Sequence, residues 1–194
     1  MQTGQFDLGA LYWQGRGVPQ DFAEAARWFQ LAAKQGYAKA QAALGDLYLV
    51  GWGVPRDNRA AQIWFRKAAE QGVARAQNKL GILYLKGQGA PPDDSLAAAW
   101  FAQAAEHGDH DAQANLATLY EAGRGVARDL THAYMWRLLS IQGTGLEPST
   151  QLRDLAFGMD ETEVAEARHR ASEWVAPHRS SHPDVLELHP VLAH

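Results

Sequence analysis

One motif recurs four times along the chain at a fixed spacing, and its most complete copy runs from Leu44 to Pro55. A tyrosine marks the same place in each copy, and consecutive tyrosines are 36 residues apart: Tyr12, Tyr48, Tyr84 and Tyr120. A constant period of this size is typical of stacked supersecondary units. Such units bury their apolar faces only against their neighbours, so the period predicts one elongated domain.

Each copy predicts two antiparallel helices. In the second copy, Ala40, Leu44 and Leu47 lie on one face of a helix that we expect over about residues 38–50. Gly45 borders this face. Because a glycine inside a helix costs about 1 kcal/mol, its recurrence indicates close packing against the partner helix. Gly51 follows the last helical residue and favours a left-handed stop.

The second helix of each copy follows an aspartate that can accept hydrogen bonds from the free N–H groups of the first turn. These aspartates are Asp21, Asp57, Asp93 and Asp129. Asp21 and Glu24 also have the spacing of a capping box. The expected core stripe of the second helix combines small and aromatic residues at helical spacing, for example Ala61, Trp64, Phe65 and Ala68.

The period divides the chain into three parts. Residues 1–148 hold four repeats, at about 2–36, 37–72, 73–108 and 109–144. Residues 149–176 predict a two-helix C-terminal cap, with helices over 149–157 and 160–175. Asp160 is the expected N-cap of the second cap helix, with Glu163 at its third position. We expect Pro177 to end that helix, and residues 177–194 to form a tail.

The repeated residues resemble the Sel-one-like repeat, a relative of the tetratricopeptide repeat. The pattern Leu-Gly-x-Leu-Tyr-x-x-Gly-x-Gly-Val-Pro-x-Asp, followed by Ala-x-x-Trp-Phe-x-x-Ala-Ala-x-Gln-Gly, is complete at 44–72. The fourth copy departs from it at Ala117, Ala127 and Arg137. The resemblance implies an all-α, right-handed superhelical solenoid of antiparallel helix pairs, whose first helices line a concave face. It also implies a non-enzymatic scaffold or adaptor in protein complexes, often in bacteria.

The candidate partner-binding residues lie on the side of the first helices away from the predicted core. For a solvent-facing side it is unusually apolar over the first three repeats, and such surfaces are typical of partner binding. The candidates are Phe6, Trp13, Asp46, Leu49, Trp52, Asn78, Ile82 and Leu85. Trp13 and Trp52 do not recur, so they are either aromatic anchors for a partner or residues packed against a neighbouring loop. The recurring Trp28, Trp64, Trp100 and Trp136 are predicted core residues.

Catalytic and cofactor motifs are weak. The chain has no Ser-x-x-Lys, Gly-x-Ser-x-Gly, His-Glu-x-x-His or phosphate-binding loop, so we expect no enzyme and no cofactor. The alternative is a β-lactamase-like or penicillin-binding hydrolase, since some cysteine-rich relatives are so described, but this chain has no cysteine. One cluster, Glu106 to Asp111, contains acidic residues and histidines that could bind a metal. A solvated polar turn between two helices explains the same residues as well. We expect no metal site.

The charge and composition of the chain limit which classes of partner and which compartments we expect. The net charge of −4 argues against nucleic acid, whose binders carry a basic surface. No apolar run reaches the roughly 20 residues of a membrane helix, and the first residues lack the features of a signal peptide. We expect a cytoplasmic protein as the sequence is written, and a periplasmic or exported one if its natural start has been trimmed. Met1 falls within the first predicted helix, which is compatible with further repeats upstream.

The tail predicts a further contact. Residues 183–192 are apolar and bounded by prolines, which favour an extended conformation. A segment of this kind could occupy the groove of the first three repeats, in the same chain or in a second copy, and so mediate self-association. A disordered tail without a role is the alternative.

Overall fold

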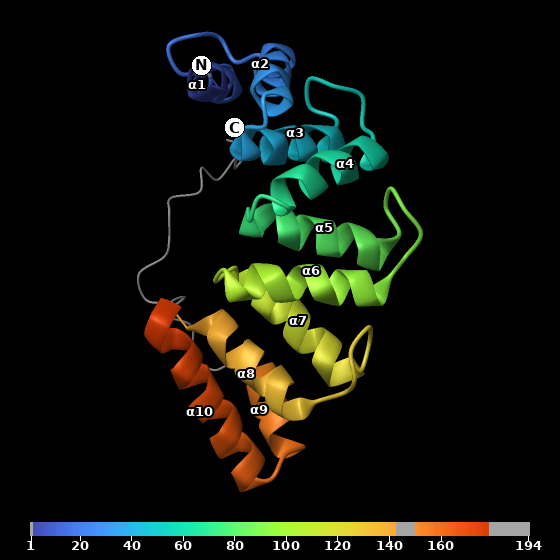
Figure 1. Ribbon diagram of the computed structural model, residues 1–194, viewed down its shortest axis with the longest axis vertical. Helices are drawn as coiled ribbons and strands as arrows, with labels where there is room; N and C mark the ends of the chain where they lie inside the picture. The colour runs from blue at the N-terminus through green and yellow to red at the C-terminus, as the bar shows by residue number, and fades with distance from the viewer. Residues whose placement is uncertain (1, 143–149, 179–194) are drawn as a thin grey trace.

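The structure is a computed structural model that describes residues 2–142 and 150–178 (Figure 1). Within these ranges it contains ten α-helices and no β-strand. They are α1 (Gln2–Gln14), α2 (Phe22–Lys34), α3 (Ala38–Val50), α4 (Asn58–Ala69), α5 (Ala74–Lys86), α6 (Asp94–Glu106), α7 (His110–Ala122), α8 (Leu130–Ile141), α9 (Thr150–Phe157) and α10 (Glu161–His178).

The first eight helices form four antiparallel pairs that follow one another along the long axis of the molecule (Figure 1). We call α1, α3, α5 and α7 the A helices, and α2, α4, α6 and α8 the B helices. From α3 onward, each A helix contacts its own B helix and the B helix of the preceding pair. This arrangement confirms the predicted all-α solenoid, in which the core lies between successive helices rather than at one centre.

The helix ends follow the sequence signals. Asp57 Oδ1 accepts from the N–H groups of Arg59 and Ala60 at 2.9 and 3.0 Å, so it caps α4 as predicted. Gly51 ends α3 with φ of 89°, a left-handed conformation that glycine adopts without a Cβ clash. The aspartates of the other pairs cap their B helices in the same way. Glu24 instead pairs with Arg27, so Asp21 caps α2 alone.

The core of the first three pairs rests on one contact that repeats. Phe65 is fully buried, and a Cβ added to Gly45 would lie 2.7 Å from its ring. The glycine therefore lets the A helix approach the phenylalanine of the B helix, as its recurrence predicted. Trp64, one residue earlier, is only half-buried. Trp64, predicted as a core residue, therefore packs only against the edge of the core, because one residue turns the side chain by about 100° around a helix. Trp136, at the same repeat position in the fourth pair, is buried as predicted.

The two helices expected after the fourth pair are present as α9 and α10. Asp160 and Glu163 make both bonds of a capping box: Glu163 N donates to Asp160 Oδ1 at 2.8 Å, and Asp160 N donates to Glu163 Oε2 at 3.0 Å. Helix α10 continues through Pro177 to His178, beyond the predicted end. A proline in the last turn removes only its own N–H bond, so it does not prevent this short extension.

Two other expectations fall on residues that the structure does not describe. The junction between the repeats and the cap lies within 143–149. Residues 183–192, predicted to occupy the groove, lie within 179–194.

Candidate functional site along the A helices

Two of the candidate partner-binding residues are buried in the core. Phe6 and Trp13 are 7% and 3% exposed, which corrects the expectation that they form an apolar floor facing solvent. Phe6 packs against Phe29 and Tyr37 at ring-centroid distances of 5.3 and 5.2 Å. In the second pair the same repeat positions hold the smaller residues Ala42 and Leu49.

The two tryptophans that do not recur pack on each other across the first and second pairs. The rings of Trp13 and Trp52 are 5.2 Å apart, and Phe22 stacks on Trp52 at 5.8 Å. Trp52 is half-buried. Of the two explanations left open by the sequence, the structure supports packing against a neighbouring loop.

A charged contact links the second and third A helices. Asp46 on α3 is buried, and its Oδ2 lies 3.0 Å from Nη2 of Arg75 on α5. Burial raises the pKa of Asp46, while the positive charges of Arg75 and Lys79 act in the opposite direction. A desolvated carboxylate held by a neighbouring helix is more frequent at functional sites than elsewhere on a protein surface.

Amide side chains continue this contact to the fourth pair. Asn78 Nδ2 on α5 donates to Asp109 Oδ1 at 3.1 Å, and Asn115 Nδ2 on α7 donates to Asn78 Oδ1 at 3.1 Å. Asp109 also caps α7 through the N–H of Ala112. Burial raises the pKa of Asp109, and the hydrogen bond from Ala112 opposes that effect. The candidate Asn78 is therefore a connecting residue between helices rather than a free one.

At the far end of the same row, a buried arginine occupies the place that phenylalanine holds in the other pairs. Arg137 on α8 is 8% exposed, and its Nη2 donates to Thr118 Oγ1 on α7 at 2.9 Å. Its Nε has no hydrogen-bond partner among the described residues. Burial lowers the pKa of Arg137, and the nearby Glu121 raises it. Sequence reasoning noted Arg137 as a departure from the repeat but did not place it in the site.

The apolar candidates lie beside these polar groups. Leu49, Ile82 and Leu85 are half-buried and pack against the core from α3 and α5. Ile82 shares one face of α5 with Arg75 and Lys79, because residues four and seven positions apart lie on the same side of a helix. We define the A-helix row as Asp46, Arg75, Asn78, Lys79, Ile82, Asp109, Asn115 and Thr118, together with Arg137, whose side chain reaches Thr118 from the B helix α8.

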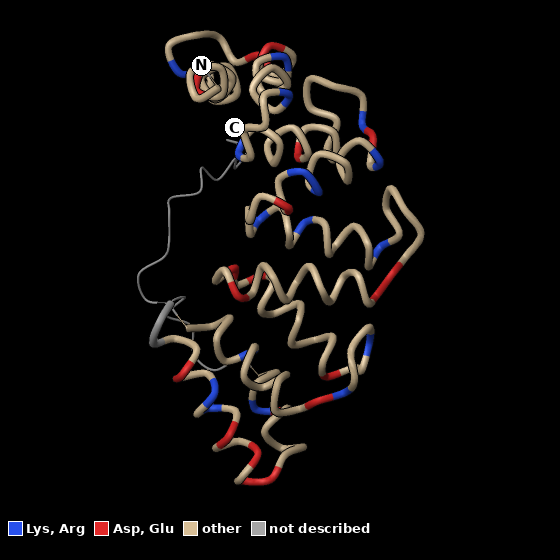
Figure 2. The backbone as a smooth tube through the Cα atoms, viewed as in Figure 1, with Lys and Arg blue, Asp and Glu red and all other residues tan. Residues whose placement is uncertain are grey.

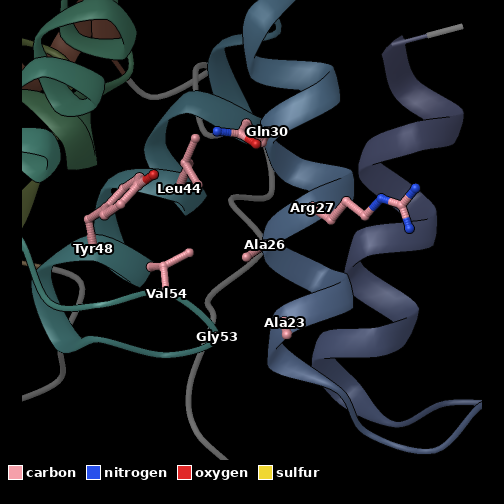
Figure 3. Close-up of a pocket in the computed structure, with 8 residues that line it drawn as sticks. All are labelled: Ala23, Ala26, Arg27, Gln30, Leu44, Tyr48, Gly53 and Val54. Atoms are coloured by element: carbon pink, nitrogen blue, oxygen red, sulfur yellow. The ribbon is translucent and has the colours of Figure 1, made fainter.

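A small pocket of about 210 Å³ lies outside this row, between α2 and α3 (Figure 3). Tyr48 and Leu44 line it from α3, and Arg27 and Gln30 from α2. The next pair shows what can fill the equivalent space: Arg66, 36 residues after Gln30, donates to the hydroxyl of Tyr84. The pocket therefore reflects a shorter side chain at one repeat position and does not belong to the candidate site.

Two residues of the cluster considered for metal binding have structural partners. His107 Nδ1 lies 3.1 Å from Gln77 Oε1, and Glu106 Oε2 accepts from Trp174 Nε1 at 2.9 Å. No group of three potential ligands converges within residues 2–142 and 150–178. Ser140 and Ser172 donate their hydroxyls to the backbone carbonyls of Arg137 and His169.

The segments that match a known protein family coincide with the helix pairs of the structure. The family model described as Sel1 repeat matches residues 3–37, 38–73, 74–109 and 110–137. The chain belongs to the Sel1 repeat family. Sel1 repeats commonly act as scaffolds for protein–protein interactions, and this fold is generally non-catalytic. Neither the family nor the matched structures support a hydrolase. No curated protein matches the chain.

Two solved structures are similar over most of this Sel1 chain. A protective antigen present in uropathogenic Escherichia coli strains, displaying an SLR fold, is 33% identical with a TM-score of 0.79 over 92% of this chain. This chain spans only 38% of the length of that antigen. A Sel1 repeat protein from Oxalobacter formigenes is 32% identical with a TM-score of 0.76, over 89% of this chain and 71% of its own.

None of the helices between residues 2 and 142 or between 150 and 178 is both long and apolar enough to cross a bilayer.

Proposed function

We propose that this Sel1 protein is a non-catalytic scaffold that holds a polypeptide partner across the A-helix row, with α5 at the centre. The observation that carries the proposal is the polar connection of Asp46, Arg75, Asn78 and Asn115 across three successive A helices. Such contacts fix the spacing of side chains along the row before a partner arrives. A preorganised surface loses less conformational entropy when it binds.

The charges of α5 favour a partner segment that combines carboxylates with apolar side chains. Arg75, Lys79 and Lys86 lie on the face of α5 that carries Ile82, and Figure 2 shows basic residues along this helix. Lys79 forms no ion pair with any described residue. A partner carboxylate could therefore pair with Lys79 while an apolar side chain rests on Ile82, and neither contact would need to break an existing ion pair.

Cross-linking from two matched positions tests the proposal. A photoreactive phenylalanine analogue at Ile82 should capture a partner in cells of the source organism, and mass spectrometry should identify it. The control is Ile63, an isoleucine on the B helix α4 that is 50% exposed. Ile82→Arg should then weaken binding of the identified partner at least about tenfold, as at an interface hot spot, while Ile63→Arg should not.

Capture from Ile63 with none from Ile82 would place the binding surface on the B helices and reject the A-helix row.

A further inference from the structure

The pocket between α2 and α3 opens beside a tyrosine that recurs in every repeat (Figure 3). Tyr48 lines the pocket from α3 and is half-buried. No residue within 2–142 or 150–178 forms a hydrogen bond with its hydroxyl. Because a buried tyrosine usually pairs its hydroxyl with another group, the pocket contains an unused hydrogen-bonding atom beside an aromatic ring.

The same place in the next repeat holds a guanidinium. Arg66 on α4 donates from Nη2 to the hydroxyl of Tyr84 on α5, and the Arg66 Cζ atom lies 6.0 Å from the centre of the Tyr84 ring. The electrons of a ring face attract such a cation. In the fourth repeat the ring of Tyr120 stacks on His132 at a centroid distance of 5.1 Å. Of these three tyrosines, Tyr48 has neither kind of partner among the described residues.

Two shorter side chains leave the space beside Tyr48 open. Gln30 lies 36 residues before Arg66, and Ala26 lies 36 residues before Gln62, which is buried. The resulting volume of about 210 Å³ is far more than the roughly 15 Å³ that one water needs. The pocket can therefore hold a planar group of the kind that Arg66 supplies in the next repeat.

The polar groups of the pocket suit a hydrogen-bond donor. The hydroxyl of Tyr48 and the Oε1 atom of Gln30 can both accept hydrogen bonds, whereas a guanidinium only donates them. Arg27 also lines the pocket, but 70% of its side chain is exposed and its Nη1 lies 3.4 Å from Glu24 Oε1. Figure 3 shows the Arg27 side chain directed away from Tyr48, so its charge does not fill the pocket.

We propose that this pocket binds a guanidinium group of the kind that an arginine side chain carries. The group lies against the ring of Tyr48 and donates to the Tyr48 hydroxyl and to Gln30 Oε1, as Arg66 donates to Tyr84 in the next repeat. The site lies outside the A-helix row, so it does not depend on the proposed scaffold surface.

N-acetyl-arginine amide, an arginine with both ends blocked, is the probe. It is titrated into the full chain and followed by ¹H–¹⁵N NMR. We expect saturable shifts at the backbone amides of Gly53 and Val54, which line the pocket, with half-saturation at roughly 10 mM, the weak affinity of a single side-chain contact. N-acetyl-citrulline amide has nearly the same shape without the charge, and it should bind at least about fivefold more weakly.

Variants of the two pocket residues test the geometry. Gln30→Arg gives the chain its own guanidinium at this place, so it should weaken binding of the probe about tenfold or more. Tyr48→Phe keeps the ring and removes the acceptor, and it should weaken binding by about tenfold, the effect of one hydrogen bond to a charged group.

Opening the next repeat in the same way should create a second site. The double variant Gln62→Ala with Arg66→Gln gives α4 the two shorter side chains that α2 carries. The probe should then also shift the amides of Gly89 and Ala90, which lie 36 residues after Gly53 and Val54.

Three results would overturn the proposal: no saturable shift at about 100 mM probe, equal binding of the citrulline compound, and unchanged binding by Gln30→Arg. Free L-arginine identifies the source of the group. Tighter binding of free L-arginine than of the blocked probe would support a site for the free amino acid, and equal binding would support a site for an arginine within a partner polypeptide.

Discussion

In the first three repeats a glycine of the A helix faces a phenylalanine of the B helix, whereas the fourth repeat places Ala117 opposite Arg137. A Cβ on Gly9, Gly45 or Gly81 would lie 2.6 to 2.7 Å from the ring of Phe29, Phe65 or Phe101. The fourth repeat changes both members of the pair, adding a methyl group on one helix and removing a ring from the other. The two positions therefore behave as one packing unit.

The exchange also changes the polarity of the unit. The phenylalanines end within the core, but Arg137 extends to Thr118 on the solvent side of α7 and keeps a buried Nε without a described partner. A buried guanidinium requires hydrogen bonds to offset the loss of hydration. In the first three repeats a buried ring fills this place, whereas in the fourth it holds a cation that reaches Thr118.

Removing an aromatic ring from the core should have the largest effect on stability. Phe65→Ala should lower the free energy of unfolding by about 3–5 kcal/mol, as expected when a fully buried aromatic is truncated. Trp64→Ala is the matched neighbour. Because Trp64 is half-buried, we expect about half that loss. Urea denaturation of both variants measures the difference, and a larger loss for Trp64 would show that the roles of the two aromatics are reversed.

Converting the fourth repeat to the pattern of the others should reveal an energetic coupling between positions 117 and 137. Arg137→Phe alone sets a ring against the methyl group of Ala117, so its benefit is limited. Adding Ala117→Gly removes the clash. In a double-mutant cycle the pair should be more stable than the sum of the single changes by about 1–2 kcal/mol. Additivity within about 0.5 kcal/mol would show that these residues are not one unit.

The reverse change in an early repeat, Gly45→Ala, should have a smaller effect on the free energy of unfolding. Alanine improves helix propensity over glycine by about 1 kcal/mol, but overpacking a core costs about 1–3 kcal/mol. Since the ring of Phe65 is fully buried and cannot swing away, Gly45→Ala should destabilise the chain by about 1 kcal/mol. Ala117→Gly, without such a ring, should also destabilise by about 1 kcal/mol through propensity alone. Thermal unfolding of both variants checks this, and stabilisation by Gly45→Ala would contradict the close packing.

The smallest expected effect depends on pH. Burial raises the pKa of Asp46 above its usual value of 3.8, so its ionised form disfavours the folded state at neutral pH. That penalty is relieved as the pH falls through the raised folded pKa toward 3.8. Relative to Asp46→Asn, the wild-type chain should therefore gain stability between pH 7 and pH 4.

Asp129 provides the control of opposite sign. Burial acts to raise the pKa of Asp129, but hydrogen bonds from His132 and the charge of that residue outweigh it, and the pKa is lowered. Its contribution is present above pH 3.8 and is lost as the pH falls through the lowered folded value. Relative to Asp129→Asn, which can still cap α8, the wild-type chain should lose stability on acidification. Urea denaturation at pH 7, 5, 4 and 3 measures both pairs, the loss for Asp129 being expected between pH 4 and pH 3, and a shared sign would contradict the assignment.

Local patterns in the sequence were sufficient for the repeat and for most helix ends. The spacing of Tyr12 to Tyr120 gave the stacked pairs, and Asp57 and Gly51 marked where α4 begins and α3 ends. These features depend on residues within a few positions of each other. Hydrogen bonds, glycine conformation and helical periodicity act at that range, so a linear reading is adequate.

Only the tertiary structure decided which side chains close the contacts between repeats. Phe6 and Trp13 have the spacing of a solvent-facing side, yet they fill the first pair, and Leu11 has the spacing of the core, yet it is 40% exposed. Asp46 meets Arg75, and Asn78 meets Asn115, from adjacent A helices. A helical pattern shows which side of one helix is apolar, but burial also requires a neighbour. Whether a neighbour is there depends on a residue's place in the array, which the repeat itself does not encode.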